Sequence, residues 1–184
     1  MRVCRVATEL FDARGYDAIT MNEVAAAAGI SRRALFNHFP SKSDLLWTGV
    51  EPFLSSLRRH LAGREAEQVG TALVAAISSA IVDLGPDLAM TRIRLRIIAE
   101  HPALAHGERP GLLAVYEELV TFLSGRAGAD RAQLEVRAQA AAVTAAVFFS
   151  LLTWASGPPS ESAPDAIRRG LAALAELAPS HTVL

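Results

Sequence analysis

The 184-residue sequence is poor in cysteine, in lysine and in net charge. Its single cysteine, Cys4, excludes an internal disulfide and a cysteine-based zinc site, and it fits a reducing compartment. The formal net charge of −1 excludes a general binder of polyanions, so affinity for a nucleic acid has to come from a local patch. Hydrophobic residues make up 51% of the chain, a high share for so small a body, and we therefore expect self-association.

The sequence also lacks the usual signs of an enzyme. No phosphate-cradling glycine loop, nucleophile elbow or inward pair of carboxylates is found, so no catalytic residue and no cofactor is predicted. Glu100, His101, His106 and Glu108 lie close together in sequence and form either a metal cluster or a solvated loop. Their spacing matches no strong zinc pattern, and we predict no metal site.

Long hydrophobic runs are missing too. Residues 140–155 form the longest one, which is shorter than the roughly 20 residues that a bilayer needs and contains Thr144, Ser150 and Thr153. We interpret it as a buried interface helix and predict no membrane association. No signal-peptide pattern is visible either, so a cytoplasmic protein is expected.

No alternating pattern of a β-strand appears anywhere, and the expected fold class is all-α. A long helix is predicted over residues 43–62, with a kink where Gly49 and Pro52 interrupt it. Residues 101–109 are expected to form a loop. The remaining helices are predicted over residues 66–84, 87–100, 110–125, 130–154 and 164–177.

Residues 20–42 have the layout of a helix-turn-helix. Thr20 and Glu23 have the spacing of a capping box, which predicts the start of a first short helix. Gly29 follows four alanines and can adopt the left-handed backbone conformation that ends a helix. Ser31 then offers the cap of a second helix, in which Leu35 and Phe39 point inward.

The outward face of that second helix carries no acid. Its residues include guanidinium groups and an amide, which can bond to base edges in a major groove: Arg32, Arg33, Phe36, Asn37 and His38. Lys42, the only lysine in the chain, follows in the first turn of the next helix. A cation there opposes the helix dipole, so a nearby phosphate explains it better than folding does.

The segment LFDARGYDAITMNEVAAAAGISRRALFNHFPSKSDLL, within residues 3–47, resembles the N-terminal domain of TetR-family transcriptional repressors. The resemblance implies a DNA-binding domain over residues 1–46, an effector-binding and dimerisation domain over residues 47–184, and a repressor that binds a palindromic operator in double-stranded DNA. It assigns phosphate contacts to Thr20, Phe36, His38 and Lys42. It assigns base or mixed contacts to Met21, Arg32, Arg33, Ala34 and Asn37.

Some of these residues have structural explanations as well. Thr20 is a helix cap in any case, His38 can pack at the helix end, and Arg33 can be solvated. Most family members have a tyrosine where this chain has Phe36, which lacks the hydroxyl that bonds a phosphate and offers only apolar contact.

Two C-terminal helices are expected to form a homodimer interface, as in the family that the chain resembles. Alanines at helical spacing allow close approach, and larger residues supply buried area. The alternative is that this stripe packs inside one subunit. The predicted interface residues are Ala138, Ala141, Ala142, Ala145, Val147, Phe148, Leu152, Ile167, Leu171 and Leu174.

A small apolar or amphiphilic effector is expected between the helices of residues 73–123. Arg92 and Arg96 share a helix face and would hold an anionic head group, while Met90, Ile93 and Ile97 would line a cavity for an acyl chain. The alternative for the arginines is a solvated face. A molecule bound between Leu45 and Phe122 would tilt the kinked helix and change the spacing of the two DNA-binding domains.

The motifs FNHFPSKSDLLW and RIRLRIIAEHPAL are similar to those of the TetR branch that includes the mycofactocin-system regulators. For that branch, fatty acyl-CoA esters are the implied class of effector.

Two other functions stay open at this point, an enzyme with a helical pocket and a dimeric binding module that no longer binds DNA.

Overall fold

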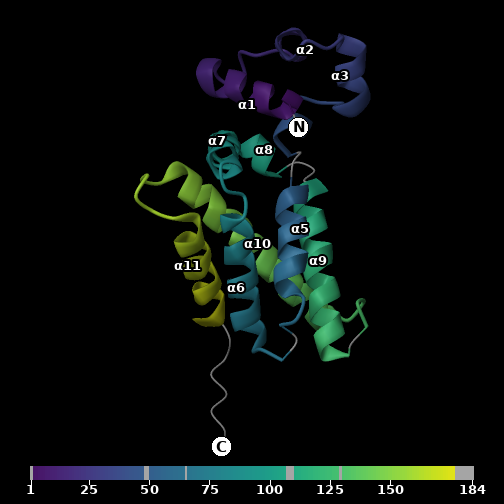
Figure 1. Cartoon of the computed structure of the whole chain (residues 1–184), viewed down its shortest axis with the longest axis vertical. Coiled ribbons are helices and arrows are strands. Elements are labelled where there is room, and N and C mark those ends of the chain that lie inside the picture. The colour runs from purple at the N-terminus through teal and green to yellow at the C-terminus, as the bar shows by residue number, and fades with distance from the viewer. Residues whose placement is uncertain (1, 48–49, 65, 107–109, 129, 177–184) are drawn as a thin grey trace, which may run out of the picture.

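The computed structural model describes residues 2–47, 50–64, 66–106, 110–128 and 130–176, and every regular element in these ranges is a helix, as predicted. Three short helices form a unit that we call the head (Figure 1). Its elements are α1 (Arg2–Arg14), α2 (Met21–Ala28) and α3 (Arg32–His38). The remaining helices are α4 (Asp44–Trp47), α5 (Glu51–Leu61), α6 (Val69–Val82), α7 (Asp87–Glu100), α8 (Pro102–His106), α9 (Pro110–Ala127), α10 (Leu134–Ser156) and α11 (Ala163–Glu176).

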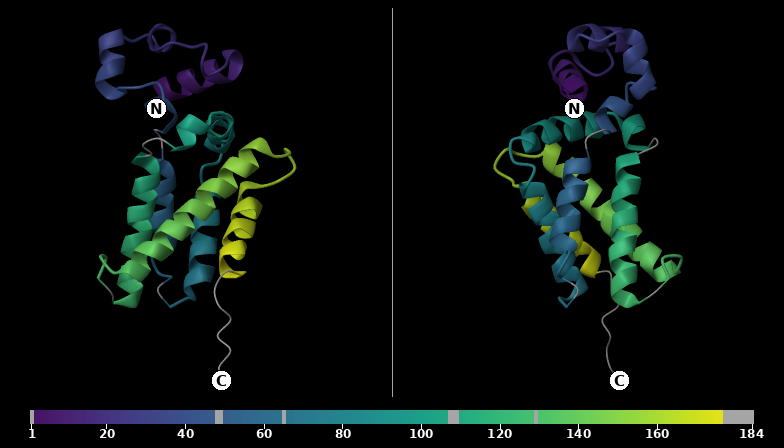
Figure 2. Two further views of the ribbon diagram at one scale, coloured as in Figure 1. Left: turned by 180° about the vertical axis from the view of Figure 1, so that it is seen from behind. Right: turned by 45° about the vertical axis from the view of Figure 1, so that its right-hand side comes forward.

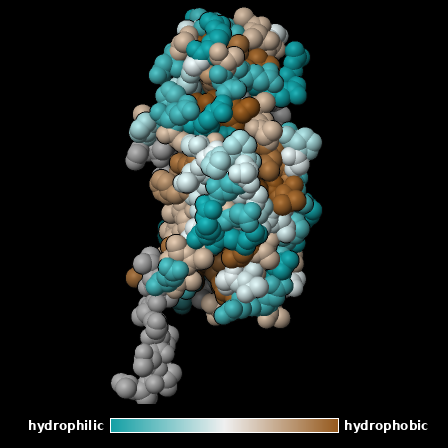
Figure 3. All heavy atoms as spheres, turned by 90° about the vertical axis from the view of Figure 1, so that its left-hand side faces the viewer, coloured by the Kyte–Doolittle hydropathy of each residue, from teal (hydrophilic) through white to brown (hydrophobic). Residues whose placement is uncertain are grey.

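Helices α5 to α11 form an elongated body, and the head lies across one end of it (Figure 2). Helices α7 and α8 lie directly beneath the head, and α5, α6, α9, α10 and α11 run along the body (Figures 1 and 2). Helix α7 therefore lies between the head and the rest of the body. In the space-filling view of the face that includes α11, hydrophobic residues show as separate patches among hydrophilic ones (Figure 3).

Two predicted segments differ from the observed helices. The expected helix over residues 43–62 is two helices, α4 and α5, and Pro52 lies in the first turn of α5 instead of kinking a continuous helix. Proline is favoured there because the first amides of a helix need no intrahelical acceptor. Gly49, the other residue of the predicted kink, lies outside the described residues. The expected loop 101–109 contains the short helix α8.

The buried residues form two clusters. One fills the body between α5, α6, α9, α10 and α11, with Leu57, Leu119 and Ile167 fully enclosed. The other joins the head to the body, since Phe11 of α1 packs in the same cluster as Ile98 of α7. Movement of α7 therefore disturbs apolar contacts of the head as well as contacts of the body.

Helices α10 and α11 pack very closely. A Cβ atom added to Gly170 of α11 would lie 1.9 Å from the hydroxyl oxygen of Ser150 on α10. A side chain at position 170 would overlap with the Ser150 hydroxyl in its present rotamer and would lie 3.2 Å from the Ser150 Cβ atom and 3.3 Å from the Ala146 carbonyl oxygen, so α10 or α11 would have to shift. The absence of a side chain at Gly170 thus allows the close packing of α10 and α11.

Candidate DNA-binding surface and effector pocket

The start of α2 has the predicted capping box. The Thr20 hydroxyl accepts a hydrogen bond of 3.3 Å from the backbone N–H of Glu23, whose carboxylate accepts one of 2.8 Å from the backbone N–H of Thr20. Arg14 of α1 also donates to this carboxylate, at 2.8 Å. These bonds, those from Thr20 first, hold the pKa of Glu23 below its usual value. The box therefore fixes α2 and also ties it to α1.

The turn between α2 and α3 is also as predicted. Gly29 has φ +68°, the left-handed conformation that glycine adopts without steric cost. Ser31 then caps α3, because its hydroxyl accepts a hydrogen bond of 3.1 Å from the backbone N–H of Ala34. Local hydrogen bonds thus set the orientation of α3 relative to α2.

One face of α3 is buried and the other is open. Leu35 is fully enclosed by the head, and Phe39 is partly buried. Five predicted contact residues of α3 are exposed, namely Arg32, Arg33, Phe36, Asn37 and His38. Ala34 and Met21 are half-buried, so they offer less surface to a partner.

Phe36 has a structural function on the exposed face of α3. The guanidinium carbon of Arg32 lies 5.4 Å from the centre of the Phe36 ring, which is 37% exposed. A cation held over an aromatic face has fewer accessible rotamers. Phe36 therefore orients Arg32 whether or not it contacts DNA itself.

For Lys42, the sequence favoured a nearby phosphate over folding as the explanation of its charge and placed it in the first turn of a helix, but the structure gives it a function in the fold. Lys42 precedes α4, and its ammonium donates hydrogen bonds to the backbone carbonyls of Tyr16, at 2.7 Å, and Ile19, at 3.1 Å. These carbonyls belong to the connection between α1 and α2. Lys42 therefore satisfies backbone acceptors of the head, a long-range contact that its position in the sequence does not reveal.

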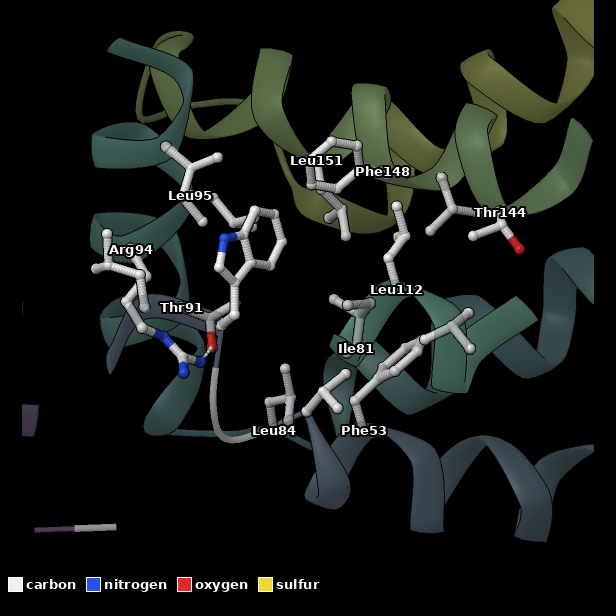
Figure 4. Close-up of a pocket in the computed structure, with 17 residues that line it drawn as sticks. Phe53, Ile81, Leu84, Thr91, Arg94, Leu95, Leu112, Thr144, Phe148 and Leu151 are labelled. Carbon is white, nitrogen blue, oxygen red and sulfur yellow. Dashed lines mark hydrogen bonds between the residues drawn. The ribbon is translucent and has the colours of Figure 1, made fainter. Parts of the chain in front are cut away.

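An apolar pocket lies in the body below the head. It has a volume of about 130 Å³, and its wall comes from α4, α5, α6, α7, α9 and α10. Phe53, Leu112 and Leu151 point into it from three different helices (Figure 4). Its few polar groups are Thr91 and Arg94 at one end and Thr144 on α10 (Figure 4). Trp47, at the end of α4, also lines it, so the pocket reaches the connection to the head.

The side of α7 that faces this pocket is not the predicted one. Thr91, Arg94, Leu95 and Ile98 line it. Of the five predicted ligand residues, Met90 lines a second cavity, Ile93 and Ile97 pack in the cluster that joins head and body, and Arg92 and Arg96 bind other parts of the protein. The arginine of this helix that sequence reasoning left out of the predicted site, Arg94, is the one at the pocket.

Both predicted arginines hold the fold together. Arg92 donates hydrogen bonds to the carbonyls of Trp154, Gly157 and Pro158, at 2.9–3.2 Å, and so covers the end of α10. Arg96 forms an ion pair with Asp12 of α1. Neither the anionic head group nor the solvated face that we considered for these residues describes this arrangement.

The residues predicted to form the dimer interface divide into a set buried inside the subunit and a set exposed on its surface. Val147, Phe148, Leu152, Ile167 and Leu171 are buried inside the subunit, and Leu174 is partly buried there, so these large side chains serve its own core. Val147 and Phe148 also line the apolar pocket. Four small residues of the predicted interface are exposed on the outer face of α10, namely Ala138, Ala141, Ala142 and Ala145. Phe149 of the same helix is 56% exposed.

By length and composition alone, α10 is a helix that could cross a membrane, and α6 with α7 would do so only as one span bent by 105°. Helix α10 packs against α7, α9 and α11 in the body. Such packing is typical of a core helix of a helical domain.

The histidine region gives no metal geometry in the described part of the chain, where no three His, Cys, Asp or Glu residues gather. The Nδ1 atom of His101 lies 2.7 Å from the carbonyl oxygen of Ile97, and its Nε2 atom lies 3.6 Å from a carboxylate oxygen of Asp17. The side chain of His106 and the whole of Glu108 lie outside the described residues.

The capped helix-turn-helix, its acid-free exposed face and the helical body are the architecture of a transcription regulator of the helix-turn-helix class. Residues 4–46 match the model of bacterial regulatory proteins of the TetR family, and residues 67–179 match the MftR C-terminal domain. The chain belongs to the TetR family. Its relatives are transcriptional regulators and not enzymes, and the family binds DNA operators as dimers and takes small-molecule ligands.

Two relatives illustrate the similarity. The chain is 30% identical over 124 residues, 67% of its length, to a Mycobacterium tuberculosis protein described as the regulator MftR of mycofactocin biosynthesis. It is 30% identical over 132 residues, 68% of its length, to the HTH-type transcriptional regulator TcmR of Streptomyces glaucescens. These matches span 63% and 55% of the two relatives.

Solved structures share the fold at low identity. The Thermus thermophilus TetR-family repressor FadR, in complex with lauroyl-CoA, has a TM-score of 0.61 at 23% identity, over 95% of this chain and 92% of that one. SmeT, the repressor of the SmeDEF multidrug efflux pump of Stenotrophomonas maltophilia, has a TM-score of 0.59 at 21% identity, over 94% and 88% of the two chains.

Proposed function

We propose that the protein is a cytoplasmic homodimeric repressor that binds a palindromic operator through α3 and is switched by a small apolar or amphiphilic effector. The observation that carries this proposal is the α3 surface. Arg32, Arg33 and Asn37 are all exposed on one capped helix, and the segment from Ser31 to Ser43 contains no acid. Arginine and asparagine are the side chains that most often bond to guanine and adenine edges.

Dimerisation is supported by the outer face of α10. Small side chains lie exposed along one long helix, and Phe149 adds an exposed ring. Alanine faces allow helices to approach closely, and an exposed apolar stripe is typical of a surface that a partner covers. A two-fold dimer presents two α3 helices to successive turns of DNA, which is why we expect a palindrome.

A boundary near residue 46 separates the two proposed functions, DNA binding before it and effector binding with dimerisation after it. The head and the body nevertheless share one buried cluster. We therefore expect the two parts to melt together, with effector binding and DNA affinity linked through the shared contacts.

Support for a fatty acyl-CoA effector comes from the match to the MftR C-terminal domain and from the fold shared with a repressor that binds lauroyl-CoA. The apolar wall of the pocket fits an acyl chain in kind. Its volume of about 130 Å³ is smaller than the 300–1,000 Å³ of typical ligand sites, so a long chain requires the pocket to open.

An electrophoretic mobility shift tests the whole proposal. Purified protein is mixed with DNA from upstream of its own gene and with a shuffled duplex of equal composition, with and without oleoyl-CoA. We expect a shift of the upstream DNA that oleoyl-CoA abolishes. Absence of any preference for the upstream DNA contradicts operator binding, and a shift that oleoyl-CoA leaves unchanged contradicts the acyl-CoA effector alone.

A further inference from the structure

A second cavity, of about 310 Å³, lies between the head and α7. Arg2 and Arg5 of α1 line one side of it, and Asp87 and Arg94 of α7 line another. The cavity shares Leu84, Thr91 and Arg94 with the apolar pocket of the body. The two cavities are therefore neighbours, with these three residues between them.

The second cavity is mainly positive. Three of its lining residues are arginines, and Asp87 is the one acid among them. Thr8 and Cys4 form a buried part of the wall, where the Thr8 hydroxyl donates its hydrogen to the Cys4 carbonyl at 2.8 Å. This part of the wall contributes no negative charge. Glu9 lies outside the lining, 4.0 Å from Arg5 and exposed, where solvent screens it.

Arg94 stands at the junction of the two cavities. Its guanidinium donates a hydrogen bond of 3.0 Å to the Thr91 hydroxyl, and both side chains lie at the same end of the apolar pocket (Figure 4). Burial lowers the pKa of Arg94, and Asp87 offsets part of this effect. A desolvated guanidinium with a fixed fork of donors is suited to bind a carboxylate or phosphate.

We propose that the two cavities form one site for an anionic amphiphile, whose apolar part fills the pocket in the body while its anionic head binds Arg94, with Arg2 and Arg5 around it. This inference rests on the proposed effector function and specifies the effector's chemistry and position. A cavity of about 150 Å³ holds a benzene molecule, so the apolar pocket accepts a compact group and not a long chain without opening.

The position of the head group has a consequence for regulation. Arg2 and Arg5 belong to the head, whereas Arg94 belongs to the body. An anion between them contacts both parts at once. The affinity of the anion then depends on the position of the head relative to the body. By linkage, binding of the anion shifts the head away from or toward the position that DNA binding requires.

Calorimetric titration of the full chain tests the site with hexanoate, hexanol and hexylammonium, which share a tail and differ in charge. We expect hexanoate to bind at least about tenfold more tightly than hexanol, and hexylammonium to bind more weakly than hexanol. Equal affinities for hexanoate and hexanol, or no binding of hexanoate at millimolar concentration, overturn the proposal.

Variants locate the charge preference. Arg94→Gln should abolish the preference for hexanoate while hexanol still binds, and the matched control Arg168→Gln, at an exposed arginine of α11, should keep it. A preference that survives Arg94→Gln overturns the proposal. If Arg94→Gln does not fold, the double variant Arg2→Gln/Arg5→Gln at exposed positions replaces it, and unchanged hexanoate affinity in that variant also overturns the proposal.

Hexanoyl-CoA distinguishes the two sources of negative charge. Tighter binding than hexanoate, lost in Arg2→Gln/Arg5→Gln, identifies coenzyme A phosphates as the head, and tighter binding of hexanoate identifies a free carboxylate; either result supports the site. DNA binding by the effector-free protein is measured in parallel. Its failure contradicts the proposed function and leaves the ligand measurements standing, whereas failed ligand binding leaves operator binding intact.

Discussion

The ammonium of Lys42 donates a hydrogen bond of 2.7 Å to the backbone carbonyl of Tyr16 and lies 4.1 Å from the centre of that residue's ring. A second bond, of 3.1 Å, goes to the carbonyl of Ile19. The turn before α4 is thereby fastened to the connection between α1 and α2. An ammonium has three donors, so these two bonds leave one, and we propose that it binds a phosphate of bound DNA.

Replacement of Lys42 by methionine should therefore affect both folding and DNA binding. We expect the free energy of unfolding to fall by about 1–3 kcal/mol, because two carbonyls lose a charged donor. The slope of log affinity against log salt should also fall by about one, with equal weakening on every sequence. Denaturant unfolding and binding titrations at several salt concentrations measure the two effects. Unchanged stability would contradict the structural function of Lys42.

Asn37→Ala should reduce discrimination between bases. Asn37 is exposed on α3, where an amide can bond to an adenine edge. We expect a loss of about 1–3 kcal/mol on the operator and little change on a shuffled duplex. Gln68→Ala, which removes an exposed amide at the start of α6, is the matched control. Equal loss on both duplexes would show that Asn37 does not read bases.

The ion pair between Arg96 and Asp12 should transmit the effector signal. Arg96 lies on α7, whose Thr91 and Leu95 line the apolar pocket, and Asp12 lies on α1. In Arg96→Asp we expect an effector to bind nearly as in the wild type but to change DNA affinity less. The reversed pair Arg96→Asp/Asp12→Arg should restore the response. Coupling is measured as the ratio of operator affinities with and without effector, and a full response in the single variant would exclude this route.

Ala142→Glu should separate the proposed dimer. Ala142 is exposed on the outer face of α10, where a buried charge in a two-fold interface has no partner of opposite sign. We expect a monomer in analytical ultracentrifugation and a loss of operator affinity of about a hundredfold or more, since one of two half-sites is abandoned. Ala62→Glu, at the exposed end of α5, serves as control. A dimer in both variants would move the interface elsewhere.

The carboxylate of Asp83 makes the stability of the body depend on pH. The carboxylate accepts hydrogen bonds from Ser56, at 2.5 Å, and from His60, at 2.9 Å, and these bonds lower its pKa from the usual 3.8. A carboxylate with a lowered pKa stabilises the folded state at pH values above its usual pKa. This stabilisation is lost as the pH falls through the lowered pKa. Asp83→Asn should therefore melt earlier than the wild type at pH 7, with the difference shrinking below about pH 4. Glu9→Gln is the control, and a difference independent of pH would contradict this assignment.

The helix-turn-helix could be predicted from sequence because its signals are local. Thr20 with Glu23, Gly29 and Ser31 each act within four residues of themselves, through hydrogen bonds or a backbone conformation. The structure confirms all three features. Lys42 is the exception in this region, since its acceptors lie 23 and 26 positions away.

The face of α7 that lines the apolar pocket could not be predicted from the sequence. This helix is packed against α1, α8 and α10, so residues on every side of it are at least partly covered and no single apolar stripe marks the pocket. Arg92 and Arg96 were attractive as a pair on one face, but their acceptors on α10 and α1 come from distant parts of the chain. In α10 the problem is similar, because apolar residues on all sides hide which ones the subunit buries itself.

Gly170 allows α10 and α11 to pack closely at Ser150, which limits the movement of these two helices relative to each other. If these helices also form the contact between subunits, the part of each protomer that faces its partner keeps its shape. Displacement by an effector then falls mainly on the other helices around the apolar pocket, of which α5 and α7 border both cavities and α4 borders the apolar pocket alone. A bulkier residue at position 170 would push α10 and α11 apart, and operator geometry would change although Gly170 lines neither the apolar pocket nor the second cavity.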